Sequence, residues 1–134
     1  MDGKTLRFTR AMIATGGRPV VPPIPGLREA GFLTNETLFA LTELPPRLAI
    51  IGAGPIGCEM AQTFQRFGSR VTLIDQADHI LVREDADAAH VLQQRLLAEG
   101  VQLLLGARVS RVEERQGTHG VVVEQGGRTT EVAC

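Results

Sequence analysis

The chain has 134 residues, of which 43% are hydrophobic and 22% charged, enough for one modest domain with an apolar core. Its formal net charge is −1 and its sequence pI is about 6.3, so the charge balance indicates no nucleic-acid partner. No apolar run is long enough to cross a bilayer, which argues against a membrane partner. The N-terminal residues lack the pattern of a signal or transit peptide, and we therefore expect a cytoplasmic protein.

The first part of the chain predicts two strands and then an extended connector. Leu6 and Phe8 alternate with polar neighbours, as in a strand with one exposed face. Residues 11–15 form an apolar run of strand type, which a glycine pair and a proline end. The prolines among residues 20–26 predict an extended, non-helical connector between two units, outside any core.

Residues 48–57 carry the motif around which the other elements are organised. An apolar run of strand type enters a turn with glycines at the first, third and sixth places. In a dinucleotide-binding turn, Gly52 would permit the tight turn, Gly54 would let the phosphates approach the backbone, and Gly57 would let the helix lie close to the strand. The first N–H groups of that helix and the positive end of its dipole would face the phosphates. The cofactor-binding residues predicted in this turn are Gly52, Ala53, Gly54, Pro55, Ile56 and Gly57.

The sequence after the turn supplies the context that this motif requires. Residues 56–67 repeat apolar side chains at helical spacing, and Gly68 is a candidate end of that helix. Residues 70–75 predict a second strand that ends in Asp75, about 20 residues beyond the turn, where a carboxylate would hold the adenosine ribose diol. A carboxylate repels a 2′-phosphate and residues 76–79 contain no arginine, so NAD is favoured over NADP. The alternative is that Asp75 only ends a strand.

The remaining chain predicts a second helix followed by four strands. Residues 84–99 have an acidic first turn and a mostly apolar face, and Gly100 would end the helix. Residues 101–105 form the continuous apolar run of a strand buried on both faces of a parallel sheet. Three strands joined by glycine turns come next, at residues 108–114, 120–125 and 128–132. The expected fold class is therefore α/β, with a Rossmann-like parallel sheet and an antiparallel three-stranded β-meander.

The chain shows no pattern of catalytic or metal-ligating residues. Cys58 and Cys134 are far apart and have no metal-ligand spacing. Cys58 lies on the first long helix, where a small packed residue is favoured over a reactive thiol. The three histidines, His79, His90 and His119, are isolated in sequence, and we expect them on the surface or in loops. We predict no catalytic residue and no metal site.

Taken together, these segments resemble the FAD- and NAD(P)-dependent pyridine nucleotide–disulfide oxidoreductases, such as dihydrolipoamide dehydrogenase and mercuric reductase. The segments that match are Ala14-Thr15-Gly16 with Arg18-Pro19, the proline-rich crossing, residues 50–59 and residues 79–85. The resemblance implies that residues 1–26 are the tail of an FAD-binding domain and residues 27–134 an NAD(P)-binding domain without its last strand. It also implies helices on one side of the parallel sheet and the meander on the other.

The resemblance also implies roles for single residues. Glu59 matches a glutamate that lies near the nicotinamide in family members, although the residue alone suggests a solvated helix position. Ala61 matches a place that stays small for close packing. Pro55 departs from the pattern, because several relatives have a tyrosine there that gates the nicotinamide pocket. NADP stays a second possibility, since mercuric-reductase-like relatives often prefer NADPH.

The leading interpretation is a fragment of a flavin-dependent oxidoreductase that positions NAD(P)H for hydride transfer to FAD. The family's FAD fingerprint, redox cysteine pair and catalytic histidine do not occur in these residues, so the fragment alone is expected to be inactive. By the resemblance, FAD belongs to the full-length parent, and that parent is a homodimer. The alternatives are an NADH oxidase or ferredoxin-reductase-like flavoprotein without a redox disulfide, and a non-catalytic NAD-sensing module.

One more expectation concerns the edge of the parallel sheet. In the family, each nucleotide domain ends with an A-T-G strand, and the second such strand does not occur in this sequence. We therefore predict that residues 11–15 fill the vacant edge beside residues 48–51, within one chain or by exchange between two copies.

Overall fold

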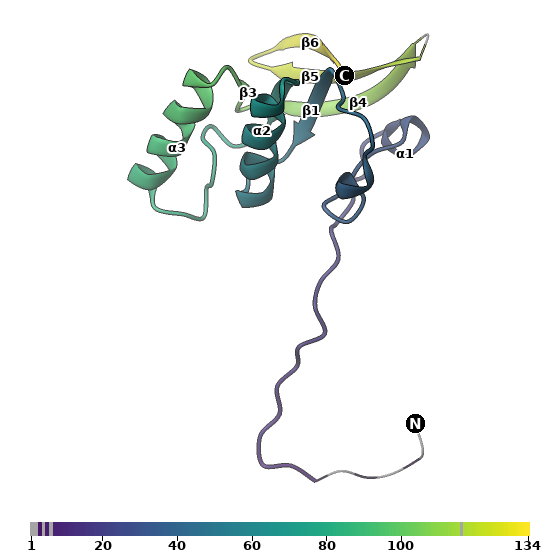
Figure 1. The fold of residues 1–134 in the computed structure, drawn as a ribbon, viewed down its shortest axis with the longest axis vertical. Helices are drawn as coiled ribbons and strands as arrows, with labels where there is room; N and C mark the ends of the chain where they lie inside the picture. The colour runs from purple at the N-terminus through teal and green to yellow at the C-terminus, as the bar shows by residue number, and fades with distance from the viewer. Residues whose placement is uncertain (1–2, 4, 6, 116) are drawn as a thin grey trace.

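The computed structural model describes residues 3, 5, 7–115 and 117–134. Figure 1 shows the helices and strands gathered at one end, with a long extended N-terminal segment leading away from them. Two three-stranded sheets form the centre, one parallel in the order β1-β2-β3 and one antiparallel in the order β4-β5-β6. The elements are α1 (Leu27–Ala30), a 3₁₀ turn η1 (Leu38–Ala40), β1 (Arg47–Ile51), α2 (Pro55–Phe67), β2 (Arg70–Ile74), α3 (Ala86–Ala98), β3 (Gln102–Leu104), β4 (Arg108–Arg115), β5 (Thr118–Gln125) and β6 (Arg128–Ala133).

The unit β1-α2-β2 forms as the sequence predicts. The two strands pair in parallel from Arg47 opposite Arg70 to Ile51 opposite Ile74. Helix α2 ends at Gly68, whose φ of 109° lies in the left-handed region that glycine adopts without strain. The N–H of Gly68 donates to two carbonyls of the last helical turn. The crossover through α2 therefore brings the carboxyl ends of both strands to the same edge of the sheet.

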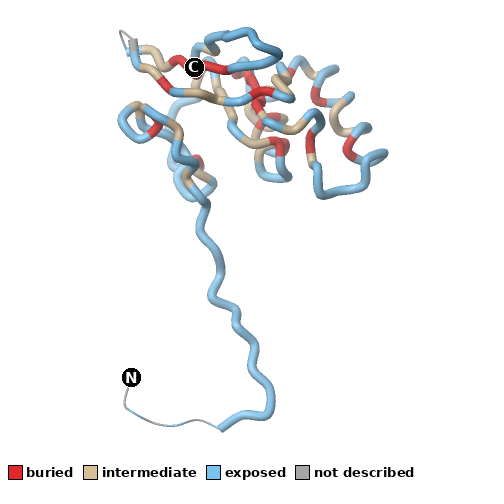
Figure 2. Tube along the Cα trace, turned by 180° about the vertical axis from the view of Figure 1, so that it is seen from behind, coloured by how far each residue is buried: buried red, intermediate tan, exposed pale blue. Residues whose placement is uncertain are grey.

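Side chains of the parallel sheet alternate between two apolar cores. On β2, Val71 and Leu73 pack with the helices, whereas Ile74 packs with the meander. Cys58 and Ala61 of α2 and Leu96 of α3 belong to the same helix-side core, and the buried residues lie mainly along the helices and strands (Figure 2). The expected architecture, helices on one side and the antiparallel meander on the other, is confirmed.

Helix α3 is held at both ends by acidic side chains. At its start, the Asp85 carboxylate accepts hydrogen bonds from the N–H groups of Asp87 and Ala88, which caps the helix. At its end, Glu99 pairs with Arg95 and with Arg66 of α2, whose Nη2 lies 2.6 Å from the Glu99 carboxylate. These partners lower the pKa of Glu99 to about 2. The ion pairs tie α2 to α3.

The proline-rich connector packs against the meander in its second half. Val21, Ile24 and Leu27 belong to the meander-side core. The Pro25 carbonyl accepts a 2.8 Å hydrogen bond from the Val112 N–H, beside an irregularity in the pairing of β4 with β5. The expectation that the whole connector lies outside any core is therefore wrong. Prolines predict extended backbone, but they do not indicate whether the side chains between them find an apolar surface.

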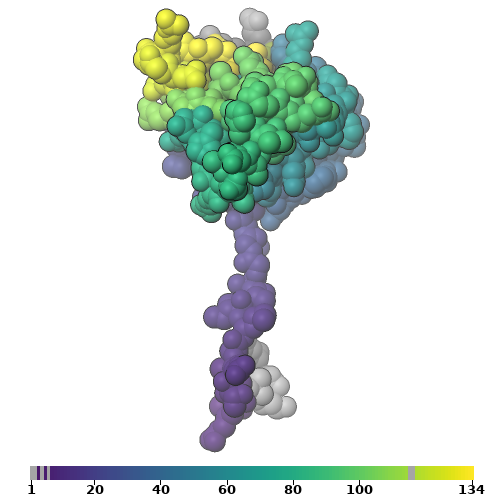
Figure 3. All heavy atoms as spheres, turned by 90° about the vertical axis from the view of Figure 1, so that its left-hand side faces the viewer, coloured from purple at the N-terminus to yellow at the C-terminus, as the bar shows by residue number. Residues whose placement is uncertain are grey.

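The N-terminal segment is not a strand in this structure. Residues 7–20 are extended and exposed, with Met12 and Ile13 each 89% accessible, and they project from the packed part as a stalk (Figure 3). Within the described residues, β1 pairs with β2 alone. The prediction that residues 11–15 fill the vacant sheet edge of the same chain is therefore wrong, as is the strand expected around Phe8, while Leu6 lies outside the described residues.

The physical reason is that strand propensity is realised only where a free edge is within reach. The connector is fixed on β4, and the segment before it leads away from β1 rather than along it. Exchange of this segment between two copies stays a prediction. Among the helices that the structure describes, none has the length and apolar character needed to cross a bilayer.

Candidate functional site

The turn between β1 and α2 lies at the carboxyl edge of the parallel sheet, where ligands bind in open α/β folds. Gly52 has a φ of 107°, and its N–H donates a 2.8 Å hydrogen bond to the Ile74 carbonyl. Gly54 is the residue before the helix and Pro55 the first helical residue, with no side-chain cap found among the described residues. The first N–H groups of α2 have no partner within the helix. An anion could therefore cap this helix.

The three glycines of the turn are required for different reasons. A Cβ on Gly57 would lie 1.9 Å from the Gly52 carbonyl oxygen, so any side chain there would separate the helix from the strand. Gly52 needs its positive φ. Gly54 has an ordinary φ of −75°, and apart from its two chain neighbours no described residue lies within 4 Å of the position its Cβ would take. Neither backbone strain nor packing explains a glycine at this place.

Asp75 lies beside the turn, as the motif spacing predicts. Its Oδ2 accepts a 2.6 Å hydrogen bond from the Ala53 N–H, and its Oδ1 accepts a 2.8 Å hydrogen bond from the Ala77 N–H. The carboxylate therefore holds the glycine turn to the end of β2. Two carboxylate oxygens can accept about four hydrogen bonds, so acceptor sites are left for a ligand hydroxyl. The sequence did not indicate this contact with the main chain.

The segment from residue 76 to residue 85 folds over the turn. The Leu81 N–H donates a 2.9 Å hydrogen bond to the Ala53 carbonyl, and the Gly106 N–H donates to the Ala77 carbonyl at 2.6 Å. Ile80 is fully buried in the helix-side core. The turn, the end of β2 and this segment therefore form one wall.

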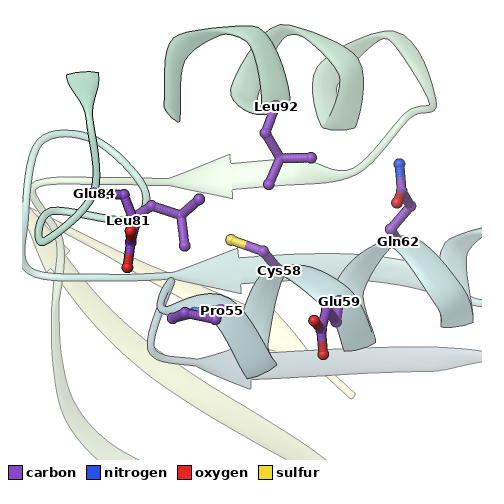
Figure 4. A pocket seen from close by; sticks show the side chains of 7 residues that line it. All are labelled: Pro55, Cys58, Glu59, Gln62, Leu81, Glu84 and Leu92. Atoms are coloured by element: carbon purple, nitrogen blue, oxygen red, sulfur yellow. The ribbon is translucent and has the colours of Figure 1, made fainter. Parts of the chain in front are cut away.

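Two neighbouring cavities open at this wall. The larger, about 370 Å³, is lined by residues 53–55, by Asp75 and His79, and by residues 81–84. The smaller, about 290 Å³, lies between α2 and α3, where Leu81, Cys58 and Leu92 face one another in Figure 4. Pro55, Leu81 and Glu84 line both cavities.

The predicted site residues divide between these cavities. Ala53, Gly54 and Asp75 line the larger one, Glu59 lines the smaller, and Pro55 lines both. The other three line neither cavity. They are Gly52, Ile56 and Gly57.

Residues that the sequence analysis did not assign to the site come from the segment after β2. Arg83 brings a positive charge to the cavity that Asp75 also lines, although residues 76–79, directly after β2, contain no arginine. His79 lines the same cavity, and its Nδ1 lies 2.7 Å from the Asp78 carboxylate, which lowers the pKa of Asp78. The only signal for these residues was that the segment matched the family.

The thiol beside the turn is buried and protonated. Cys58 is 2% exposed, and its Sγ lies 3.5 Å from the Ala53 carbonyl oxygen. Burial, and next the negative charges of Asp75 and Glu59, raise the pKa of the thiol to about 11. No group of three metal-ligating side chains occurs in the part of the chain that the structure describes.

Known proteins that resemble this chain include reductases and an oxidase. A mercuric reductase from Bacillus cereus is 37% identical over 128 residues, which cover 96% of this chain and 20% of that protein. The Cu(II) complex of the flavoprotein disulfide reductase RclA from Escherichia coli matches with a TM-score of 0.75 at 37% identity, over 87% of this chain and 27% of that chain. An engineered water-forming NADPH oxidase bound to NADPH matches with a TM-score of 0.74 at 28% identity, over 87% of this chain and 27% of that chain. This chain thus spans about a fifth to a quarter of these relatives.

The family model described as pyridine nucleotide-disulphide oxidoreductase matches residues 1–134. The glycine turn on a parallel sheet, the meander behind it and the relatives all agree with that match. This chain therefore belongs to the pyridine nucleotide-disulphide oxidoreductase family.

Proposed function

We propose that this chain is the NAD(P)-binding part of a flavin-dependent oxidoreductase, in which it positions NAD(P)H for hydride transfer to FAD. Residues 1–26 are the tail of the FAD-binding domain in this proposal, and residues 27–134 form the NAD(P)-binding domain. When bound, the reduced nicotinamide supplies a hydride, and the residues of this chain bind and orient the dinucleotide. The parent protein is a cytoplasmic homodimer in this proposal.

The environment of Gly54 is the observation that carries the proposal. Its φ of −75° is open to any residue, and apart from its two chain neighbours no described residue would contact a Cβ there. A glycine that the folded chain does not need is explained by something that approaches the backbone from outside. The helix N-terminus beside it supplies N–H groups and a positive dipole end, which suit a diphosphate.

Asp75 supports NAD as the preferred dinucleotide. Its carboxylate lies at the cavity with acceptor sites to spare, which suits a ribose diol and opposes a 2′-phosphate. The engineered NADPH oxidase supports the same reasoning. One of its substitutions replaces a glycine by alanine. Another replaces an aspartate by alanine, and that aspartate is as far along the chain from the glycine as Asp75 is from Gly57 here. The residue directly after the aspartate changes from alanine to arginine. Arg83 is the feature of this chain that opposes the preference.

A second candidate is a flavoprotein that reduces oxygen and has no redox disulfide. The likeness to the water-forming oxidase favours it, because that structure covers this chain as fully as RclA does. Both candidates use the same dinucleotide site and differ in the electron acceptor. Flavin content and NADH oxidation by the full-length protein, with oxygen or a disulfide as acceptor, distinguish them from each other and from a sensor without chemistry.

Titration of this chain with NADH and with NADPH tests the site. In Gly54→Val the branched side chain would occupy the space assigned to the diphosphate, so binding should weaken at least tenfold while the circular dichroism spectrum stays unchanged. Gly17→Val is the matched control, because Gly17 also has an open environment but lies in the exposed N-terminal segment. Undiminished binding by Gly54→Val would contradict the proposal.

The role of Asp75 in nucleotide preference is tested by the ratio of the dissociation constants for NADH and NADPH. A single constant is not enough, because Asp75 also accepts a hydrogen bond from the Ala53 N–H. Loss of that hydrogen bond should weaken NADH and NADPH equally, whereas loss of the charge should favour NADPH alone. In Asp75→Asn we therefore expect the ratio of the two dissociation constants to move toward NADPH by about tenfold. An unchanged ratio would leave Asp75 with a structural role only.

A further inference from the structure

The backbone of Ala53 is held from two directions by residues that come after β2. Its N–H donates to the Asp75 carboxylate at 2.6 Å, and its carbonyl accepts from the Leu81 N–H at 2.9 Å. A trans peptide is planar, so its C=O and N–H point in opposite directions. When Leu81 fixes the Ala53 carbonyl, it also fixes the direction of the Gly54 N–H, which belongs to the same peptide unit. This N–H is at the point where the proposed function places the diphosphate.

Leu81 makes this contact from an unfavourable backbone conformation. Its φ is 54°, and in the described part of the chain it is the only non-glycine residue with a positive φ. A leucine in the left-handed region is strained and persists only where the surroundings hold it in place. A glycine would adopt the same backbone without strain. The presence of leucine therefore indicates that its side chain is needed.

The side chain of Leu81 extends from the loop toward α2 and α3. In Figure 4 it points toward Cys58 on α2 and lies below Leu92 on α3. It packs against the helix-side core and lines both cavities. Leu81 thus packs its side chain on the helix-side core, and its strained backbone contacts the peptide before Gly54.

We propose that Leu81 is a positioning residue for the dinucleotide, which acts by orienting the Gly54 N–H through the Ala53 carbonyl. This inference rests on the proposed function, because it assigns a purpose to the orientation of that N–H. The packed side chain keeps the loop closed on the turn, and the closed loop keeps the peptide in the orientation that faces the ligand. The rigid turn then needs no reordering when the diphosphate binds.

The test compares substitutions at Leu81 with a matched apolar truncation elsewhere. Leu81→Gly retains the N–H and removes the side chain, Leu81→Met retains an unbranched apolar side chain, and Val91→Ala shortens an exposed residue of α3 that lines neither cavity. We expect the dissociation constant for NADH to rise about tenfold in Leu81→Gly and to change less than twofold in the other two. We also expect the Gly54 amide resonance to shift in Leu81→Gly without ligand, which a general loss of stability in a folded variant would not cause.

Each outcome decides between the two proposals. If the unaltered chain binds NADH and folded Leu81→Gly binds it equally well with an unshifted Gly54 resonance, the role of Leu81 is refuted and the proposed function stands. If the unaltered chain binds neither NADH nor NADPH, the proposed function fails and this inference with it. If Leu81→Gly does not fold, Leu81→Ala takes its place and the same two measurements apply.

Discussion

Two stretches of this chain look alike in sequence and differ completely in structure. Residues 11–19 and residues 48–55 each have an apolar run of strand type that ends at glycines and a proline. The second becomes β1, pairs with β2 and begins the candidate site. The first stays extended and exposed. The two runs differ in the segment that follows each of them. After β1 an amphipathic helix returns the chain alongside the strand, whereas the connector after residues 11–19 is fixed elsewhere, on β4.

An apolar run therefore becomes a strand only when the chain also supplies a neighbouring strand to pair with and a helix or sheet that covers its apolar face. Amide hydrogen exchange would break this conclusion if residues 12–14 proved as protected as β1. Such protection would indicate that the segment pairs with a second copy, and its dependence on protein concentration would show it.

The largest expected effect separates the glycines of the two stretches. A Cβ at Gly57 would lie 1.9 Å from the Gly52 carbonyl oxygen, whereas Gly17 has nothing of the described chain within 4 Å. Gly57→Val should therefore lower the free energy of unfolding by about 4 kcal/mol or prevent folding. Gly17→Val should change it by less than about 0.5 kcal/mol. Urea denaturation of both variants measures the difference, and similar values would contradict a close contact between helix and strand.

A smaller difference is expected between an apolar side chain of the parallel sheet and one of the N-terminal segment. Leu73, opposite β1 on β2, is fully buried, and Leu73→Ala should cost about 3 kcal/mol of unfolding free energy through lost burial and the cavity left behind. Ile13 is 89% exposed, so Ile13→Ala should cost about 0.5 kcal/mol or less. Thermal and urea unfolding would check this pair. A substantial cost at Ile13 would mean that the segment packs in solution.

Removing the N-cap of α3 measures how much helix capping contributes to the free energy of unfolding of the packed region. The Asp85 side chain accepts two backbone hydrogen bonds at the start of α3, and Asp85→Ala should cost about 1 kcal/mol. Asp85→Asn and Asp85→Ser, which retain an acceptor, should recover most of that loss. If all three variants unfolded at the same urea concentration as the unaltered chain, the cap would not contribute to stability.

The smallest expected effect depends on pH and on the ion pairs between α2 and α3. Arg66 and Arg95 lower the pKa of Glu99 from 4.5 to about 2, so the carboxylate stabilises the folded state above pH 4.5 and this contribution is lost as the pH falls toward 2. Asp78 has its pKa lowered by His79 and acts in the same direction. The difference between the unaltered chain and Glu99→Gln isolates the Glu99 contribution. Parallel stability curves from pH 6 to pH 2 would refute it.

The sequence predicts the parts of the fold that depend on local pattern. The boundaries of α2 and β2 can be read from the spacing of apolar residues and from the position of Gly68, and the meander from its glycine turns. The packing of Val21 and Ile24 on the meander could not be predicted, because it depends on where β4 lies in space.

The position of the candidate site was predictable from the sequence, but the hydrogen bonds within it were not. The glycine spacing and the distance to Asp75 place the turn and the carboxylate side by side. The second role of Asp75, as a partner of the Ala53 N–H, depends on the detailed path of the turn. Leu81 carries no sequence signal beyond its place in the matching segment 79–85, since a leucine in the left-handed region looks like any other apolar loop residue.

The protonated, buried state of Cys58 makes it a native probe of how often the glycine turn opens. With a pKa of about 11, only about one thiol in ten thousand is ionised at pH 7, and the group is 2% exposed. Alkylation therefore requires a local opening that exposes the first turn of α2. The rate of that reaction, measured by mass spectrometry with and without dinucleotide, would report the opening frequency of the site without any added label.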